Sequence, residues 1–128
     1  MVDTDAVLRS FLIQNPGVTG LAGKRIFAGV NPPPGYKPAD GPALVFNIRG
    51  GLPDYSNLTL APSYQFRCIA ITLAEARTLD RALYEALQDK SGIGVKIARM
   101  EAIGQPLTEP STGWPFVLSY YRIFFNNQ

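Results

Sequence analysis

The sequence predicts an α+β domain in which an antiparallel sheet of about four to five strands of mixed length packs against one long helix and one or two short helices. Residues 42–49, 64–71, 95–103 and 114–125 have the pattern of strands, with side chains that alternate between two faces. Amphipathic patterns favour a long helix at 73–88 and a shorter helix near the N-terminus. A chain of 128 residues has the size of one domain, so we expect residues 1–128 to fold as a single unit.

The N-terminal segment should begin with a helix and end with a strand. Helical spacing of apolar residues starts after Thr4 and stops before a proline, which disfavours a further helical turn. Asp3 and Asp5 stand at this helix start, where acidic residues favour the helix dipole. A second helical turn, closed by Gly23, then leads into a short strand at 25–28.

Two long loops interrupt the strands. Residues 31–42 have the sequence NPPPGYKPADGP, whose five prolines remove backbone donors and favour a stiff, extended path. A Gly-Gly pair ends the following strand, so we expect a second irregular stretch over residues 51–63. Loops of this length are uncommon inside compact domains and often have a function.

The long helix has the clearest start signal in the chain. Thr72 and Glu75 are spaced as a capping box, in which each side chain satisfies a backbone donor at the helix start. Its apolar residues fall on one face, which we expect to pack on the sheet. Arg81 and Glu85 lie mostly on the other face and form a solvated pair rather than a site.

The last strand is apolar on both faces. It contains six of the fourteen aromatic residues of the chain. Alternation of side chains along a strand places one set on the first face of the sheet, namely Trp114, Phe116, Leu118, Tyr120 and Phe124. The opposite set is Val117, Tyr121, Ile123 and Phe125. Helices on one side of the sheet would leave the other set exposed, as a patch larger than monomers usually tolerate. Oligomer formation would bury that patch, and so would the first helix or a long loop.

The composition excludes several kinds of chemistry. Without histidine the chain cannot form a Ser-His-Asp triad, a Cys-His pair or the usual zinc site, and no phosphate-binding or calcium-binding loop appears. Cys68, the only cysteine, is expected to be a packed core thiol. We therefore expect no catalytic residue, cofactor or metal. A net charge of +2 is too small for a sequence-driven nucleic-acid binder, and no apolar run is long enough for a membrane span, so proteins are the expected partners.

The order of segments resembles a known family over nearly the whole chain. GKRIFAG is followed by the proline-rich loop, by PALVFNIRGGLPDYS, by YQFRCIAITLAEARTLDRALYEAL and by EPSTGWPFVLSYYRIFF. This order is similar to that of the tail completion, or tail terminator, proteins of long-tailed (siphovirus-like) bacteriophages. The most specific stretch is 65–87, where a strand with an embedded cysteine runs directly into a capped helix.

The resemblance implies a structural virion protein and not an enzyme. Such proteins form a homo-oligomeric ring, a hexamer in this family, that caps the tail tube, stops its polymerisation and offers the surface for head-tail joining. The implied partners are further copies of the chain, the tail tube protein and a head completion or connector protein. Genome DNA would pass through the lumen without specific binding, and no membrane is involved. The implied location is the tail or neck of the virion, with assembly in the host cytoplasm.

Seven residues are candidates for interfaces, because aromatic residues and arginine are typical interface anchors. They lie in the first long loop, in the second, and in the last strand with its preceding turn, and they are Tyr36, Lys37, Asp54, Tyr55, Trp114, Tyr121 and Arg122. Three alternatives stay open. They are a head completion or connector adaptor of the phage neck, a small enzyme that uses carboxylates and tyrosines, and a protein-binding module that forms no ring.

Overall fold

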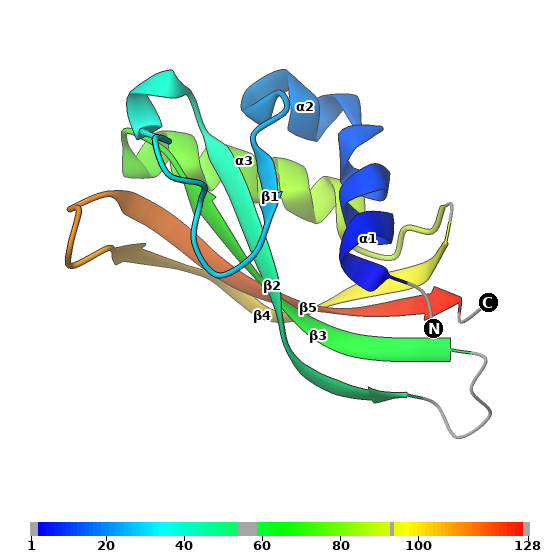
Figure 1. Ribbon diagram of the computed structural model, residues 1–128. Coiled ribbons are helices and arrows are strands. Elements are labelled where there is room, and N and C mark those ends of the chain that lie inside the picture. Colours follow the sequence, from blue (N-terminus) through cyan, green and yellow to red (C-terminus); the bar gives the residue numbers. More distant parts are fainter. Residues whose placement is uncertain (1–2, 54–58, 93, 127–128) are drawn as a thin grey trace.

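The structure, a computed structural model, describes residues 3–53, 59–92 and 94–126, and these residues form two layers. Three α-helices lie together over one face of a five-stranded sheet (Figure 1). The sheet is mostly antiparallel, and the predicted α+β fold class is confirmed.

The N-terminal elements follow the predicted order, and they are α1 (Thr4–Ile13), α2 (Pro16–Ala22) and β1 (Ile26–Ala28). Asp3 caps α1, because its carboxylate accepts a hydrogen bond of 3.2 Å from the backbone of Ala6. Asn15 caps α2 in the same way, with a proline in the first helical position. Gly23 ends α2 at a φ of 59°, a backbone angle that glycine adopts without strain.

The strands run in the spatial order β1-β2-β3-β5-β4, where the longer four are β2 (Ala43–Pro53), β3 (Thr59–Ile69), β4 (Val95–Thr108) and β5 (Pro115–Asn126). β1 pairs with β2 in parallel, and all other pairs are antiparallel. A parallel pair requires the chain to return along the sheet before the second strand begins. Residues 29–42, with the short 3-10 helix η1 (Pro38–Asp40), make this return.

The second irregular stretch was predicted too long. β2 continues to Pro53 and β3 begins at Thr59, so residues 51–53 and 59–63 of the stretch that was expected to be irregular belong to strands. The glycine pair does not end β2, because Gly50 and Gly51 continue the pairing with β3 after a β-bulge between Ile48 and Gly50. β4 likewise runs beyond its predicted end at residue 103, with register shifts along its length.

The long helix α3 (Leu73–Leu87) is confirmed almost to the residue. Thr72 Oγ1 accepts a 3.2 Å hydrogen bond from the backbone of Glu75, which satisfies one donor at the helix start. The predicted apolar face is buried, with Leu79 and Leu83 fully covered. The helix therefore packs on the sheet as its pattern indicates.

Removing this cap should destabilise the protein. We expect Thr72→Ala to lower the free energy of unfolding by about 1 kcal/mol, because the backbone donor of Glu75 loses its acceptor. Thr78→Ala is the matched control, since Thr78 lies within α3 and caps no donor at the helix start. Its exposed hydroxyl donates to the carbonyl of Ala74 and accepts a 3.3 Å hydrogen bond from Arg81. Urea unfolding curves followed by circular dichroism give both values. Equal losses in the two variants would contradict the role of Thr72.

The core lies between the helices and the sheet. Its sheet side contains Phe46, Tyr64, Phe66, Tyr121 and Phe125, whose rings contact one another at centroid distances from 5.4 to 6.2 Å. Cys68 is fully buried among them, as predicted, and burial raises the pKa of its thiol. This thiol is a packing group rather than a reactive one.

Candidate interaction surface

The sheet face that points away from the helices carries the candidate surface. The even-numbered side chains of β5 lie on it, partly exposed, and they are Phe116, Leu118, Tyr120, Arg122 and Phe124. The odd-numbered side chains from Val117 to Phe125, including Tyr121, are buried on the helix side. The alternation predicted for this strand is therefore confirmed, and the face away from the helices is the one with free apolar surface.

One end of this face is covered by the proline loop, residues 31–42. Tyr36 of the loop packs edge-on against Phe27 and Trp114, with ring centroids 6.2 Å and 5.7 Å apart. Its hydroxyl donates a 2.8 Å hydrogen bond to the carbonyl of Gly41, and burial raises the pKa of Tyr36 to about 12. Tyr36 thus holds the loop down on a second, smaller apolar cluster.

Arg25 fixes the far end of the same loop. Its Nε donates a 2.9 Å hydrogen bond to the carbonyl of Pro42, and its guanidinium lies against Gly41. A Cβ at position 41 would lie 2.2 Å from Arg25 Nη2, and the φ of 126° is one that other residues rarely adopt. The proline loop is therefore an anchored strap over the sheet.

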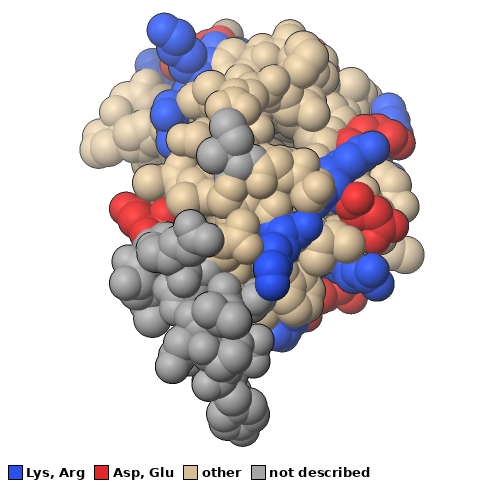
Figure 2. Space-filling view, turned by 90° about the vertical axis from the view of Figure 1, so that its right-hand side faces the viewer, with Lys and Arg blue, Asp and Glu red and all other residues tan. Residues whose placement is uncertain are grey.

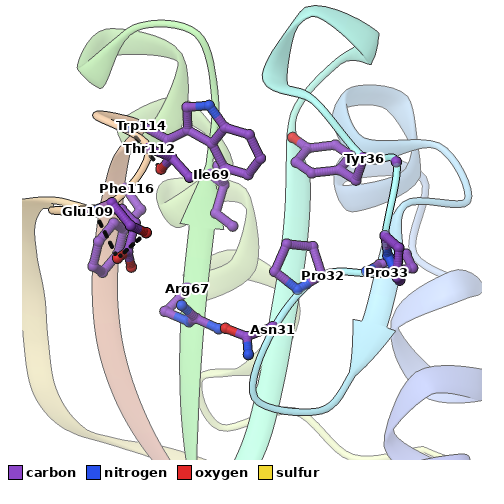
Figure 3. Close-up of a pocket in the computed structure, with 13 residues that line it drawn as sticks. Asn31, Pro32, Pro33, Tyr36, Arg67, Ile69, Glu109, Thr112, Trp114 and Phe116 are labelled. Carbon is purple, nitrogen blue, oxygen red and sulfur yellow. Dashed lines mark hydrogen bonds between the residues drawn. The ribbon is translucent and has the colours of Figure 1, made fainter.

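A pocket of about 300 Å³ opens between the proline loop and the sheet (Figure 3). Loop residues from Asn31 to Tyr36 form one wall, and Trp114 and Phe116 lie on the other side. Arg67 of β3 also lines it, 5.9 Å from the centre of the Phe116 ring. Glu109 stands in the same lining, where its carboxylate accepts a 3.1 Å hydrogen bond from the hydroxyl of Ser111.

The guanidinium of Arg67 is short of partners. Its Nε and Nη2 are out of contact with water and have no hydrogen-bond acceptor among the described residues. Burial lowers the pKa of Arg67, and the charge of Glu109 offsets this only in part. A buried donor without an acceptor is costly, so these two nitrogens mark an unusual position in the fold.

The other end of the face lies beyond the loop and is polar at its margin. The guanidinium of Arg49 lies 4.1 Å above the ring of Tyr120. Arg122 pairs with Glu101 at 3.2 Å and also donates to the carbonyl of Ala61, while Ser63 donates to the same carboxylate. Burial by itself raises the pKa of Glu101, but the hydrogen bonds from Ser63 and Arg122 outweigh this effect and lower the pKa. This network joins β3, β4 and β5.

The predicted interface residues divide into separate groups. Tyr36 and Trp114 are brought together beside the pocket, and Lys37 is exposed at the start of η1. Arg122 belongs to the network at the other end of the face. Tyr121 is fully buried on the helix side, so its side chain is not part of the surface. Asp54 and Tyr55 lie outside the described residues.

Two residues that the sequence did not single out for this surface belong to it. Arg67 lines the pocket and Glu101 holds Arg122, and each depends on a residue far away in the chain. Charge alternation along a strand would not have distinguished them from solvated residues. On the surface that Figure 2 shows, positive and negative side chains are intermixed, with Lys and Arg beside Asp and Glu around a largely uncharged area. No basic patch stands out in this view.

Two further kinds of site are absent from the described part of the chain. No group of three or more acidic or cysteine side chains is arranged to hold a metal ion in residues 3–53, 59–92 and 94–126. Among the same residues, no helix is long and apolar enough to cross a membrane.

The fold defines a class of small α+β domains built from a mostly antiparallel sheet with helices on one face. No known protein family matches the sequence, and no curated protein is similar to it. Nineteen chains of solved structures match in fold. One belongs to the "Virion of native gene transfer agent (GTA) particle", with a TM-score of 0.67 and 12% identity over 98% of this chain and 99% of that chain. At this identity the similarity shows a common fold.

Proposed function

We propose that the protein is a structural component of a phage-like virion, with no enzymatic role. The observation that carries this proposal is the fold similarity to a chain of a gene transfer agent virion, which covers both chains almost completely. The free apolar face of β5 adds support, because an assembly subunit needs surface to bury.

Within the virion, we propose that the chain closes into a ring that caps the tail tube, ends its polymerisation and joins it to the head. A ring requires two different patches that meet between neighbouring copies. The partly exposed residues Leu118, Tyr120 and Phe124 form one such patch. Six-fold symmetry is taken from the resemblance to the tail terminator family. A head completion or connector adaptor is the nearest alternative role.

Native mass spectrometry and electron microscopy test this assembly. We expect the protein, alone at high concentration or mixed with purified tail tubes, to form a closed oligomer of one size. Leu118→Asp combined with Tyr120→Asp should abolish it and leave the melting temperature within a few degrees, because both side chains are partly exposed.

Ile103→Asp is the matched control, since Ile103 is an apolar residue of β4 that is 84% exposed. It should leave the oligomer intact. A strict monomer under both conditions would contradict the ring. Oligomers that attach to heads and never to tail tubes would instead favour the connector role.

A further inference from the structure

We propose that the pocket under the proline loop receives the carboxylate of an acidic side chain carried by a partner protein, with Arg67 as its counter-ion. The pocket lies at the covered end of the sheet face, whereas the proposed ring contact uses the open end. The inference therefore stands whether or not the chain forms a ring.

The chemistry of the occupant follows from the unpaired edge of Arg67. Nε and Nη2 are the two nitrogens on one edge of a guanidinium, and this edge pairs with both oxygens of a carboxylate in parallel hydrogen bonds. Neither nitrogen has an acceptor among the described residues. The guanidinium therefore gives up no hydrogen bond to the described residues when it turns towards an entering ligand, which lowers the cost of binding.

The lining of the pocket suits a protein side chain. Trp114, Phe116 and the loop prolines offer apolar walls around a single cation. A volume of about 300 Å³ is at the lower end of the range for binding pockets. Glu109 in the lining repels any anion, so a ligand with repeated charges, such as a nucleic-acid backbone, is disfavoured more strongly than a single carboxylate that pairs with Arg67. The combination favours an Asp or Glu carried on an otherwise uncharged segment.

A different protein fits this role better than a second copy of the chain. Most described carboxylates of this chain already accept a hydrogen bond or an ion pair within it, and they are Asp3, Asp5, Asp40, Asp89, Glu101 and Glu109. Asp80 of α3 is only half-exposed, and its Oδ1 is out of contact with water. The net charge of +2 also favours a partner with an acidic surface.

The single tryptophan of the chain gives a direct readout, because Trp114 lines the pocket. The probes are the capped peptide acetyl-Pro-Glu-Leu-amide and its neutral match acetyl-Pro-Gln-Leu-amide. We expect a saturable change of fluorescence with the glutamate peptide, and binding about 10-fold weaker or more with the glutamine peptide, because a charge-assisted pair is lost. Equal responses to both peptides, or no response up to about 10 mM, would overturn the proposal.

Arg67→Met tests the counter-ion, since methionine keeps an apolar stem and removes the charge. We expect the response to the glutamate peptide to disappear and the melting temperature to stay equal or rise, because a desolvated cation without a partner has been removed. Arg49→Met is the matched control, as Arg49 lies on the same face over Tyr120. It should keep the response. A clear fall in the melting temperature of Arg67→Met would show that the guanidinium supports the fold instead.

Two further arms identify other occupants. Inorganic phosphate and a short single-stranded oligonucleotide are titrated in the same way, and tighter binding of either through Arg67 would overturn the carboxylate assignment. Native mass measurement of Arg67→Met without peptide tests whether the pocket binds a second copy of the chain. Loss of an oligomer that the wild type forms would place a neighbouring copy in the pocket and reject a separate partner.

Discussion

Phe66→Ala should lower the free energy of unfolding by about 3 to 5 kcal/mol, the largest effect that we expect from a single side chain. Phe66 is fully buried at the centre of the sheet, and its ring packs against Phe46, Tyr64 and Tyr121 at 5.8, 6.2 and 5.4 Å. Removing the ring leaves a cavity that these rigid neighbours fill only in part. Urea unfolding followed by circular dichroism measures the loss.

Phe124→Ala is the matched control, because it removes the same ring from the open face of β5. Phe124 is only partly buried, so its cost at low protein concentration should be about 1 kcal/mol. If assembly buries this face, the cost of Phe124→Ala should grow as the protein concentration is raised, while that of Phe66→Ala changes little. If Phe66→Ala and Phe124→Ala lowered the free energy of unfolding equally at every protein concentration, the distinction between the two faces of the sheet would be contradicted.

Most of the secondary structure could be predicted from the sequence, because the patterns that indicate helices and strands are local. Caps such as Thr72 and the alternation along β5 involve residues within a few positions of each other, and both were found where predicted. The extension of β2 past its glycine pair was missed, since a bulge depends on the partner strand. Pairing with β3 compensates for the weak strand propensity of glycine.

The candidate surface was harder to predict because it depends on contacts between distant segments. Both faces of β5 are aromatic, so the sequence did not show which of them the helices cover, and Tyr121 was grouped with Trp114 although it points the other way. The position of the proline loop follows from the parallel pairing of β1 and β2. This pairing joins two separate segments and cannot be recognised from the residues of either segment alone. Arg67 lies beside that loop in the same pocket, and its unpaired nitrogens have no signature in the local sequence either.

Asp80→Asn should raise the free energy of unfolding at neutral pH by about 1 to 3 kcal/mol. Asp80 of α3 points towards β5, and its Oδ1 has no hydrogen-bond partner among the described residues. The hydroxyls of Ser119 and Tyr121 are also buried without a hydrogen-bond partner among the described residues. Gly104 of β4 packs against the carboxylate, and a Cβ at this position would lie 2.5 Å from Asp80 Oδ2. Asparagine keeps the shape of the side chain and removes the charge that burial disfavours.

The dependence on pH separates charge from shape. Burial raises the pKa of Asp80 above its ordinary value of 3.8. The nearby hydroxyl dipole of Ser119, which lies outside hydrogen-bond geometry, and the positive charges of Arg77 and Arg81 offset this only in part. The folded state therefore holds the proton more tightly than the unfolded chain does. Its contribution to stability is complete below the ordinary pKa and is lost as the pH rises through the raised one.

Urea unfolding of the wild type and Asp80→Asn across this pH range gives the comparison. The difference in stability should be small below the ordinary pKa, grow as the pH rises towards the raised pKa of the folded state, and level off above it. Asp89→Asn is the control, because Asp89 is exposed and pairs with Arg99 only at 3.7 Å, so it should produce little change. A constant difference between wild type and Asp80→Asn at every pH would assign the effect to packing. A loss of stability in Asp80→Asn at neutral pH would mean that the ionised carboxylate supports the contact between α3 and β5.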